Sequence, residues 1–82
     1  MKISVRVFGR YKDIAAIDHI IFDIKEGGTI QDIIDAFVKR YPFTEIDKNR
    51  MMVSKNKIYI SHDTPVQNGD EVTLCPPVVS GG

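Results

Sequence analysis

The sequence TIQDIIDAFVKRYP, residues 29–42, carries the strongest structural signal in this chain of 82 residues. Its large apolar side chains recur at the i, i+3, i+4, i+7 and i+8 spacing that gathers them on one face of a helix. These side chains belong to Ile30, Ile33, Ile34, Phe37 and Val38. The pattern predicts one amphipathic helix whose apolar face must be covered by another layer of structure.

Both ends of this helix are marked in the sequence. Thr29 suits the N-cap position, and Asp32, three residues later, suits the positive end of the helix dipole. Two basic residues favour the other end, and Pro42 makes the residue before it a poor site for helix. We therefore expect the helix to run from about Ile30 to Arg40.

Two strand patterns precede the helix. Residues 3–8 and residues 19–24 both alternate apolar and other side chains at a period of two, which is typical of half-buried strands. Residues 10–16, between them, could hold a short helical turn, and Gly27 and Gly28 supply a turn before the helix. The side chains expected to face the core are Ile3, Val5, Val7, Ile20, Phe22 and Ile24.

Shorter strands follow the helix. Residues 43–50 read as a polar loop, and residues 51–53 and 58–60 read as short strands, with Asn56 as the best candidate for a left-handed turn residue between them. Residues 71–75 form the last strand pattern, with Val72 and Leu74 directed inward.

This element order predicts an α+β roll, in which a mixed sheet of four to five strands packs on one main helix. The first and last strands would lie side by side in that sheet. Residues 1–75 would form the domain, and residues 76–82 an extended, flexible C-terminal tail.

Composition restricts the class of partner. The chain has 11 basic and 11 acidic side chains and no long block of either sign, which argues against nucleic acid or a membrane as the main partner. No apolar run is long enough to span a bilayer, and no signal peptide is evident, so we expect a soluble, cytoplasmic protein. A single cysteine, Cys75, cannot form an internal disulfide or supply a zinc or iron–sulfur site. A protein partner is the expectation that remains.

The tail is PPVVSGG, residues 76–82. Its two prolines stiffen the exit from the last strand, and Gly81 and Gly82, which lack a β-carbon, could thread a narrow slot. Residues 76–82 could extend over at most about 25 Å. The tail is therefore suited to insertion into another protein.

The chain resembles the β-grasp, ubiquitin-like sulfur carriers, and within them most closely the small subunit of molybdopterin synthase. The resemblance rests on VRVFGRYKDIA, on TIQDIIDAFVKRYP, on VSKNKIYISHDTPVQNGDEV and above all on its NGDEV turn and on the PPVVSGG tail. It implies that the carboxylate of Gly82 is adenylated by an E1-like enzyme that uses ATP with Mg. A sulfurtransferase then supplies the sulfur of a thiocarboxylate, which the synthase large subunit uses to build molybdopterin for the molybdenum cofactor. The chain would bind no cofactor and would not be an enzyme on its own.

The same resemblance implies a partner-binding surface. Phe8, Tyr59 and Cys75 match exposed apolar positions of one sheet face, and Lys12 matches a basic residue near it. From the residues alone, Phe8 could instead be a core residue at a slipped register, and Cys75 reads more simply as a small apolar strand residue than as a reactive thiol. The tail residues expected to contact the partner are Pro77, Val78, Val79, Ser80 and Gly81.

Two features depart from the family pattern. Cys75 stands where a large apolar residue is common, and the tail has one residue more than usual between Pro77 and Gly81, which shifts the carboxylate by about 3.5 Å. Two other functions therefore stay open. One is a ubiquitin-like modifier joined through Gly82 to lysines, as in archaeal small modifiers. The other is a sulfur carrier for thiamine thiazole synthesis, which is disfavoured because such carriers are usually shorter after the helix and lack the double proline.

Overall fold

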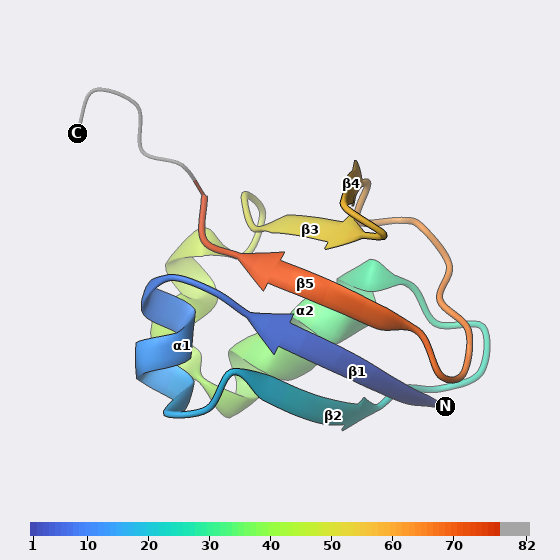
Figure 1. Cartoon of the computed structure of the whole chain (residues 1–82), viewed down its shortest axis with the longest axis horizontal. Coiled ribbons are helices and arrows are strands. Elements are labelled where there is room, and N and C mark those ends of the chain that lie inside the picture. Colours follow the sequence, from blue (N-terminus) through green and yellow to red (C-terminus); the bar gives the residue numbers. More distant parts are fainter. Residues whose placement is uncertain (78–82) are drawn as a thin grey trace.

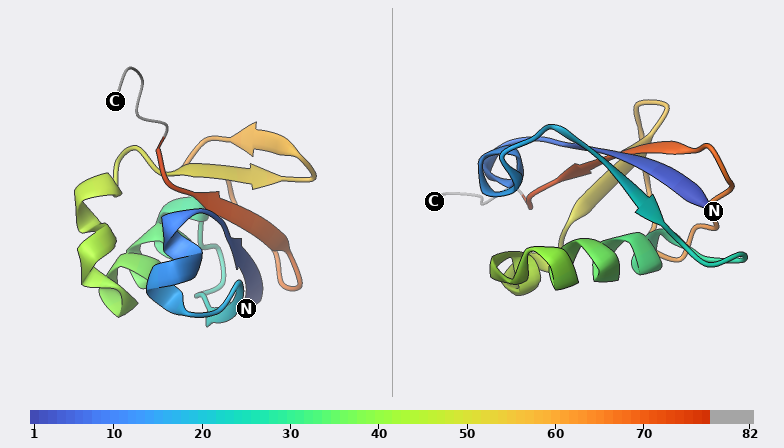
Figure 2. Two further views of the ribbon diagram at one scale, coloured as in Figure 1. Left: turned by 60° about the vertical axis from the view of Figure 1, so that its left-hand side comes forward. Right: turned by 90° about the horizontal axis from the view of Figure 1, so that it is seen from below.

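Helix α2 (Ile30–Arg40) packs against one side of a five-stranded mixed sheet (Figures 1 and 2). The computed structural model describes residues 1–77. The other elements, in chain order, are β1 (Lys2–Val7), α1 (Arg10–Ala15), β2 (His19–Asp23), η1 (Pro42–Asp47, a 3₁₀ helix), β3 (Met52–Lys55), β4 (Ile58–Ile60) and β5 (Glu71–Cys75). The predicted α+β roll with one main helix is confirmed.

The sheet has the order β2-β1-β5-β3-β4. The pair β1 and β5 is parallel, and the other three pairs are antiparallel. The first and last strands therefore lie side by side at the centre of the sheet, as the sequence predicts. Because β5 is the central strand, the chain leaves the sheet after Cys75 from the end of its middle strand (Figure 1).

The bounds of α2 agree with the prediction, and its N-terminus shows why. Thr29 and Asp32 form a capping box, in which the backbone amide of Thr29 donates a hydrogen bond to Asp32 Oδ2 at 2.8 Å. The predicted apolar stripe is buried in full, since Ile30, Ile33, Ile34 and Phe37 have no exposed surface and Val38 is 8% exposed.

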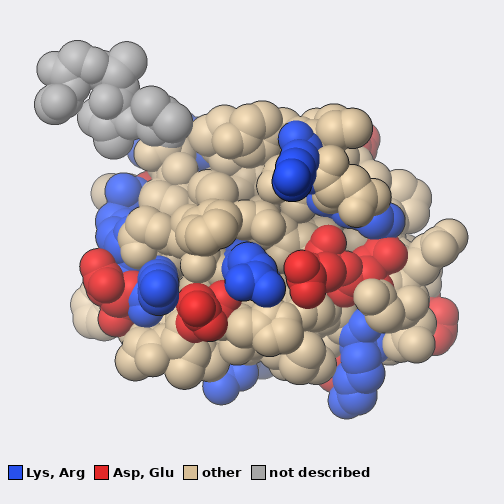
Figure 3. Space-filling model, viewed as in Figure 1, with Lys and Arg blue, Asp and Glu red and all other residues tan. Residues whose placement is uncertain are grey.

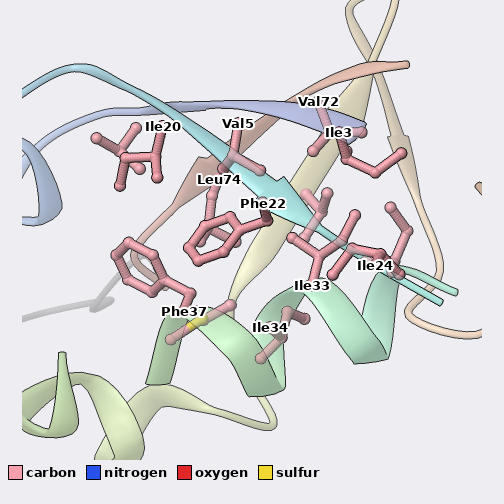
Figure 4. Close-up of a cluster of buried hydrophobic side chains, with 14 of the residues drawn as sticks. Ile3, Val5, Ile20, Phe22, Ile24, Ile33, Ile34, Phe37, Val72 and Leu74 are labelled. Atoms are coloured by element: carbon pink, nitrogen blue, oxygen red, sulfur yellow. The ribbon is translucent and has the colours of Figure 1, made fainter. Parts of the chain in front are cut away.

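The core lies between α2 and the inner side of the sheet (Figure 4). All eight strand side chains predicted to face inward are buried, which confirms the period-two reading of these segments. They are Ile3, Val5, Val7, Ile20, Phe22, Ile24, Val72 and Leu74.

The prediction of a polar loop over residues 43–50 is wrong. Residues 42–47 form η1, with Pro42 in its first turn, and the side chains of Thr44 and Asp47 are buried. The β3–β4 turn also differs in part, because Asn56 and Lys57 both have positive φ, at 55° and 67°. Two consecutive left-handed residues make the two-residue turn that suits the twist of a hairpin, and only Asn56 was expected.

Helix α1 occupies the segment that was predicted to hold a short helical turn. Its Tyr11 is fully buried and packs on Phe37 of α2, with ring centroids 5.4 Å apart. Among residues 1–77, no helix is long and apolar enough to cross a membrane.

Candidate functional site

The tail begins at the end of β5, and we call Pro76 and Pro77 the tail base. The backbone amide of Phe8 donates to the carbonyl of Leu74 at 3.2 Å, which extends the central parallel pair by one residue beyond β1. Pro76 and Pro77 follow, and both are half-buried. The remaining predicted tail residues, Val78, Val79, Ser80, Gly81 and Gly82, lie outside the described residues.

Gly9 lies against this base. Its φ of +62° falls in the left-handed region that favours glycine. A β-carbon at Gly9 would stand only 3.2 Å from Cγ of Pro76. Glycine therefore allows the chain to turn from β1 into α1 while Pro76 packs directly on it. The sequence does not predict this contact, because nothing local connects Gly9 with Pro76.

One side of the sheet faces away from α2, and register places two of the predicted interface residues together there. Val7 pairs with Leu74 and both point into the core, so Phe8 and Cys75, one position later, lie beside each other on the opposite side. Met52 pairs with Cys75 on the other flank. Phe8 is 51% exposed, whereas Met52 and Cys75 are half-buried.

Tyr59 lies on the same side. Val53, which is buried, pairs with Ile60, so the neighbouring pair of Ser54 and Tyr59 points away from the core. Tyr59 is 64% exposed. On β2, Ile21 pairs with Ser4, and that pair also faces outward. We call this side of the sheet the open face; its apolar members are Phe8, Ile21, Met52, Tyr59 and Cys75.

The open face confirms the predicted exposure of Phe8 and Tyr59 and their common side with Cys75. The alternative, that Phe8 is a core residue at a slipped register, is wrong. Ile21, 53% exposed, was missed as a surface residue, although its position between Ile20 and Phe22 in the alternating strand gave the signal.

Charges on this side are mixed. Arg6 lies on the open face, level with Thr73 in the register, and its guanidinium is 4.0 Å from the carboxylate of Glu71. Figure 3, which looks onto the sheet from the side opposite α2, shows acidic and basic side chains interspersed among other residues. An apolar contact area with a mixed polar surround is typical of protein interfaces.

Lys12 is exposed on α1, which follows Gly9 directly. Among the described residues, no hydrogen bond or ion pair joins its ammonium group to the open face. The structure therefore places Phe8, Tyr59 and Cys75 on one side of the sheet, with Tyr59 two strands away from Cys75, and leaves Lys12 on a separate element.

Cys75 is a poor nucleophile in this setting. Burial raises the pKa of its thiol, and the thiol is the inert form of the side chain. This supports the simpler interpretation of Cys75 as a small apolar strand residue. Asp70, in the turn before β5, has a structural role. Its carboxylate accepts hydrogen bonds from the backbone amide of Gln67 at 2.8 Å and from the ammonium group of Lys55 at 3.0 Å.

The sequence does not predict a polar cluster that joins α1 to η1. Tyr11 donates its hydroxyl hydrogen to Asp47 Oδ2 at 2.8 Å, and Arg10 donates to the same oxygen at 2.5 Å. Burial, and then the hydrogen bond to Asp47, raise the pKa of Tyr11 well above its usual value, so that it stays a neutral donor. The cluster fixes α1, and hence Gly9, relative to η1. Among residues 1–77, no group of His, Cys, Asp and Glu is arranged to hold a metal ion.

Comparison with known proteins decides the family. Residues 5–82 match the ThiS family, so the match includes the open face, the tail base and both final glycines. The chain belongs to the ThiS family. A relative of this ThiS family chain is the molybdopterin synthase sulfur carrier subunit of Arabidopsis thaliana, 27% identical over the whole chain and 84% of the relative.

Solved structures agree with this assignment. A Pyrococcus furiosus protein considered to be subunit 1 of a molybdopterin converting factor is 26% identical, with a TM-score of 0.82 over 95% of this chain and 99% of that one. SAMP1 of Haloferax volcanii is also 26% identical, with a TM-score of 0.81 over the full length of both chains. The β-grasp fold expected for this ThiS family chain is confirmed.

Proposed function

We propose that this ThiS family chain is the sulfur carrier subunit of a molybdopterin synthase, with the sulfur held at the carboxylate of Gly82. The observation that supports this most is that the family match runs through the tail to Gly82, while the Arabidopsis sulfur carrier subunit is similar over the whole chain. The position of the tail base, at the end of the central strand, fits this role, because the carrier must present its C-terminal residues to other proteins.

The chemistry needs a partner at each step. A carboxylate is a poor electrophile, so it must first be joined to AMP, with pyrophosphate as the leaving group. The 82 residues contain no GxxxxGK[ST] phosphate loop, so an E1-like enzyme would supply the site for ATP and Mg. The carrier itself contributes only the acyl group.

Sulfur then replaces oxygen. The terminal sulfur of a cysteine persulfide on a sulfurtransferase attacks the acyl carbon, the bond to AMP breaks, and AMP leaves with the electron pair. The resulting acyl disulfide is cleaved by a second thiol, which forms a disulfide with the donor cysteine and releases the thiocarboxylate. With free hydrosulfide as the source, attack gives the thiocarboxylate directly and a proton goes to solvent.

The open face would dock the partners. Phe8 and Tyr59 are more than half exposed. Phe8 directly follows β1 and Tyr59 lies on β4, and β5 lies between these two strands in the sheet order, so a partner covering both side chains would also cover the tail base. The activating enzyme and the synthase large subunit both need the tail, so they would bind in turn. A mixed-charge, largely apolar contact area is suited to such exchange.

The direct test is the intact mass of the chain after incubation with ATP, Mg, the E1-like enzyme and sulfide. We expect a gain of about 16 Da, as one oxygen is replaced by sulfur at the terminal carboxylate. A variant with one alanine added after Gly82 is the control and should gain nothing. An unchanged mass for the wild-type chain, under conditions where the enzyme loads a known carrier, would contradict the proposal.

One observation favours a second function. SAMP1 of Haloferax volcanii, whose name stands for small archaeal modifier protein 1, matches the full length of this chain. The carrier could therefore also be joined through Gly82 to lysines of other proteins. Expression of a variant with a protease site placed before Gly81, followed by a search for Gly-Gly remnants on lysines, would reveal such conjugates. Their absence, with thiocarboxylate present, would leave sulfur transfer as the function.

A further inference from the structure

The 3₁₀ helix η1 has its polar side inward and its apolar side outward. Residues three apart lie above one another in a 3₁₀ helix. Thr44 and Asp47 form the inner row and are 1% and 4% exposed. Phe43 and Ile46 form the outer row and are 86% and 79% exposed, the highest values among the large apolar side chains of the described residues. Buried apolar side chains are the rule in a protein core, whereas a pair of large apolar side chains on the surface indicates a candidate contact site for a partner.

This orientation is held in place by hydrogen bonds. The Thr44 hydroxyl donates to the carbonyl of Tyr41 at 2.7 Å, and Asp47 accepts from Tyr11 and Arg10. Rotating η1 to bury Phe43 would leave these polar groups without partners in a buried environment, which is unfavourable. The fold therefore keeps Phe43 and Ile46 on the surface.

The charges that neighbour this pair in the sequence are mainly positive. The segment from residue 39 to residue 50 has four basic and two acidic side chains, and one of the acids, Asp47, is buried and bound to Arg10. Glu45 is exposed. The basic side chains, three exposed and one half-buried, are Lys39, Arg40, Lys48 and Arg50. Lys48, the half-buried one, is paired with Asp35 of α2 at 3.2 Å, so among the described residues the unpaired positive charge comes from the other three. A second copy of the chain would bring these like charges together, so self-association is disfavoured.

The location of η1 separates it from the open face. Figure 2 shows η1 in the same layer as α2, on the other side of the sheet from the open face. A protein confined to the open face would leave η1 uncovered. The two surfaces can thus be occupied at the same time.

We propose that Phe43 and Ile46, with the basic residues beside them, form a second docking surface for a protein with an apolar groove rimmed by carboxylates. This inference rests on the proposed function and assigns the surface to the sulfurtransferase. Sulfur loading is the step that needs a third protein, because the activating enzyme already holds the open face and the tail while the acyl-adenylate exists. A donor that recognises η1 is brought to that complex without competing for either.

The test compares two sulfur sources for the full-length chain with Phe43→Ser and Ile46→Ser. With the E1-like enzyme, ATP and a persulfide-loaded sulfurtransferase, we expect the apparent KM for the sulfurtransferase to rise about tenfold, with kcat unchanged. With free sulfide, and in ATP–pyrophosphate exchange, the variant should equal the wild type. Lys39→Glu with Arg40→Glu should also raise this KM, whereas Lys25→Glu with Lys57→Glu, the same charge change elsewhere, should not.

Other outcomes would overturn the inference. An unchanged KM for the sulfurtransferase would exclude docking at η1. An equal loss of thiocarboxylate formation with free sulfide would show that the substitutions impair adenylation by the E1-like enzyme. Binding of the wild-type chain to phosphatidylserine vesicles that is lost in the variant, with the KM unchanged, would assign the surface to a membrane. If the wild-type chain gains about 16 Da with sulfide but never with a sulfurtransferase, the inference fails and the proposed function stands. If it gains mass with neither source, the proposed function fails.

Discussion

The hydroxyl of Tyr11 on α1 donates a hydrogen bond to Asp47 at the end of η1, over a distance of 2.8 Å and a separation of 36 residues. Tyr11 has no exposed surface and Asp47 is 4% exposed, so the pair joins two elements through a buried contact. Arg10, whose side chain is half exposed, is the third member of the cluster and pairs with the same carboxylate of Asp47. Together these residues fix the segment that begins at Gly9, on which Pro76 rests.

Tyr11→Phe tests this cluster. The change removes one donor from a buried carboxylate and should lower the free energy of unfolding by about 1–3 kcal/mol. Urea unfolding followed by circular dichroism measures it. Tyr59→Phe is the matched control, because that tyrosine is exposed, and it should change stability by no more than about 0.5 kcal/mol. Equal effects of the two variants would mean that the buried bond contributes nothing.

Gly9→Ala tests the contact with the tail base. A side chain at a φ of +62° should cost about 1–2 kcal/mol of stability, and the new β-carbon would press on Pro76 and displace it. Gly27→Ala is the control, since Gly27 has a φ of +78° with nothing within 4 Å of an added β-carbon. Both variants should lose similar stability.

Only Gly9→Ala should slow thiocarboxylate formation, measured by intact mass at a temperature where both variants are folded. The reason is that only Gly9 touches the residue from which the tail departs. Equal loading rates for the two variants would show that the position of Pro76 is unimportant for the reaction.

Phe8→Ser and Tyr59→Ser test the open face. Each removes an exposed apolar side chain, so folding should be unaffected, while the Kd for the synthase large subunit should rise about tenfold or more. Isothermal titration calorimetry measures this. Phe43→Ser, on the other side of the sheet, should leave that Kd unchanged. If it weakened binding as much as Phe8→Ser, the large subunit would not be confined to the open face.

The parts of this molecule that the sequence predicts are those set by local pattern. The helix from Ile30 to Arg40 follows from apolar spacing and a capping box that lies within four residues, and the alternation in β1 and β2 determines which side chains are buried. These features depend only on residues that are close together in the sequence. The exposure of Tyr59 was expected only from the family resemblance, and the register of β3 and β4 accounts for it.

The parts that escaped prediction depend on long-range contacts. Residues 43–50 look polar and irregular because the groups that order them, Tyr11 and Arg10, lie far away in the sequence. The role of Gly9 depends on Pro76, and the alternation places Phe8 on the outer side without revealing that no loop covers it. The covalent role of Gly82 rests on the sequence and the family match alone.

Asp70→Asn tests the turn before β5 through its pH dependence. Burial alone would raise the pKa of Asp70, but the Gln67 amide and the Lys55 ammonium outweigh it and hold the pKa below its usual value. A lowered folded-state pKa means that the ionised carboxylate stabilises the fold above the unfolded value, about 3.9, and that this stability is lost as pH falls through the folded pKa. The wild-type chain should therefore be more stable than Asp70→Asn at pH 7, by about 1 kcal/mol for these two hydrogen bonds. The difference should shrink as the pH is lowered below about 4, and urea midpoints measured from pH 7 down to about 2 would show it. A difference for Asp70→Asn that stays constant down to the lowest pH would mean that the ionisation of Asp70 does not stabilise the turn.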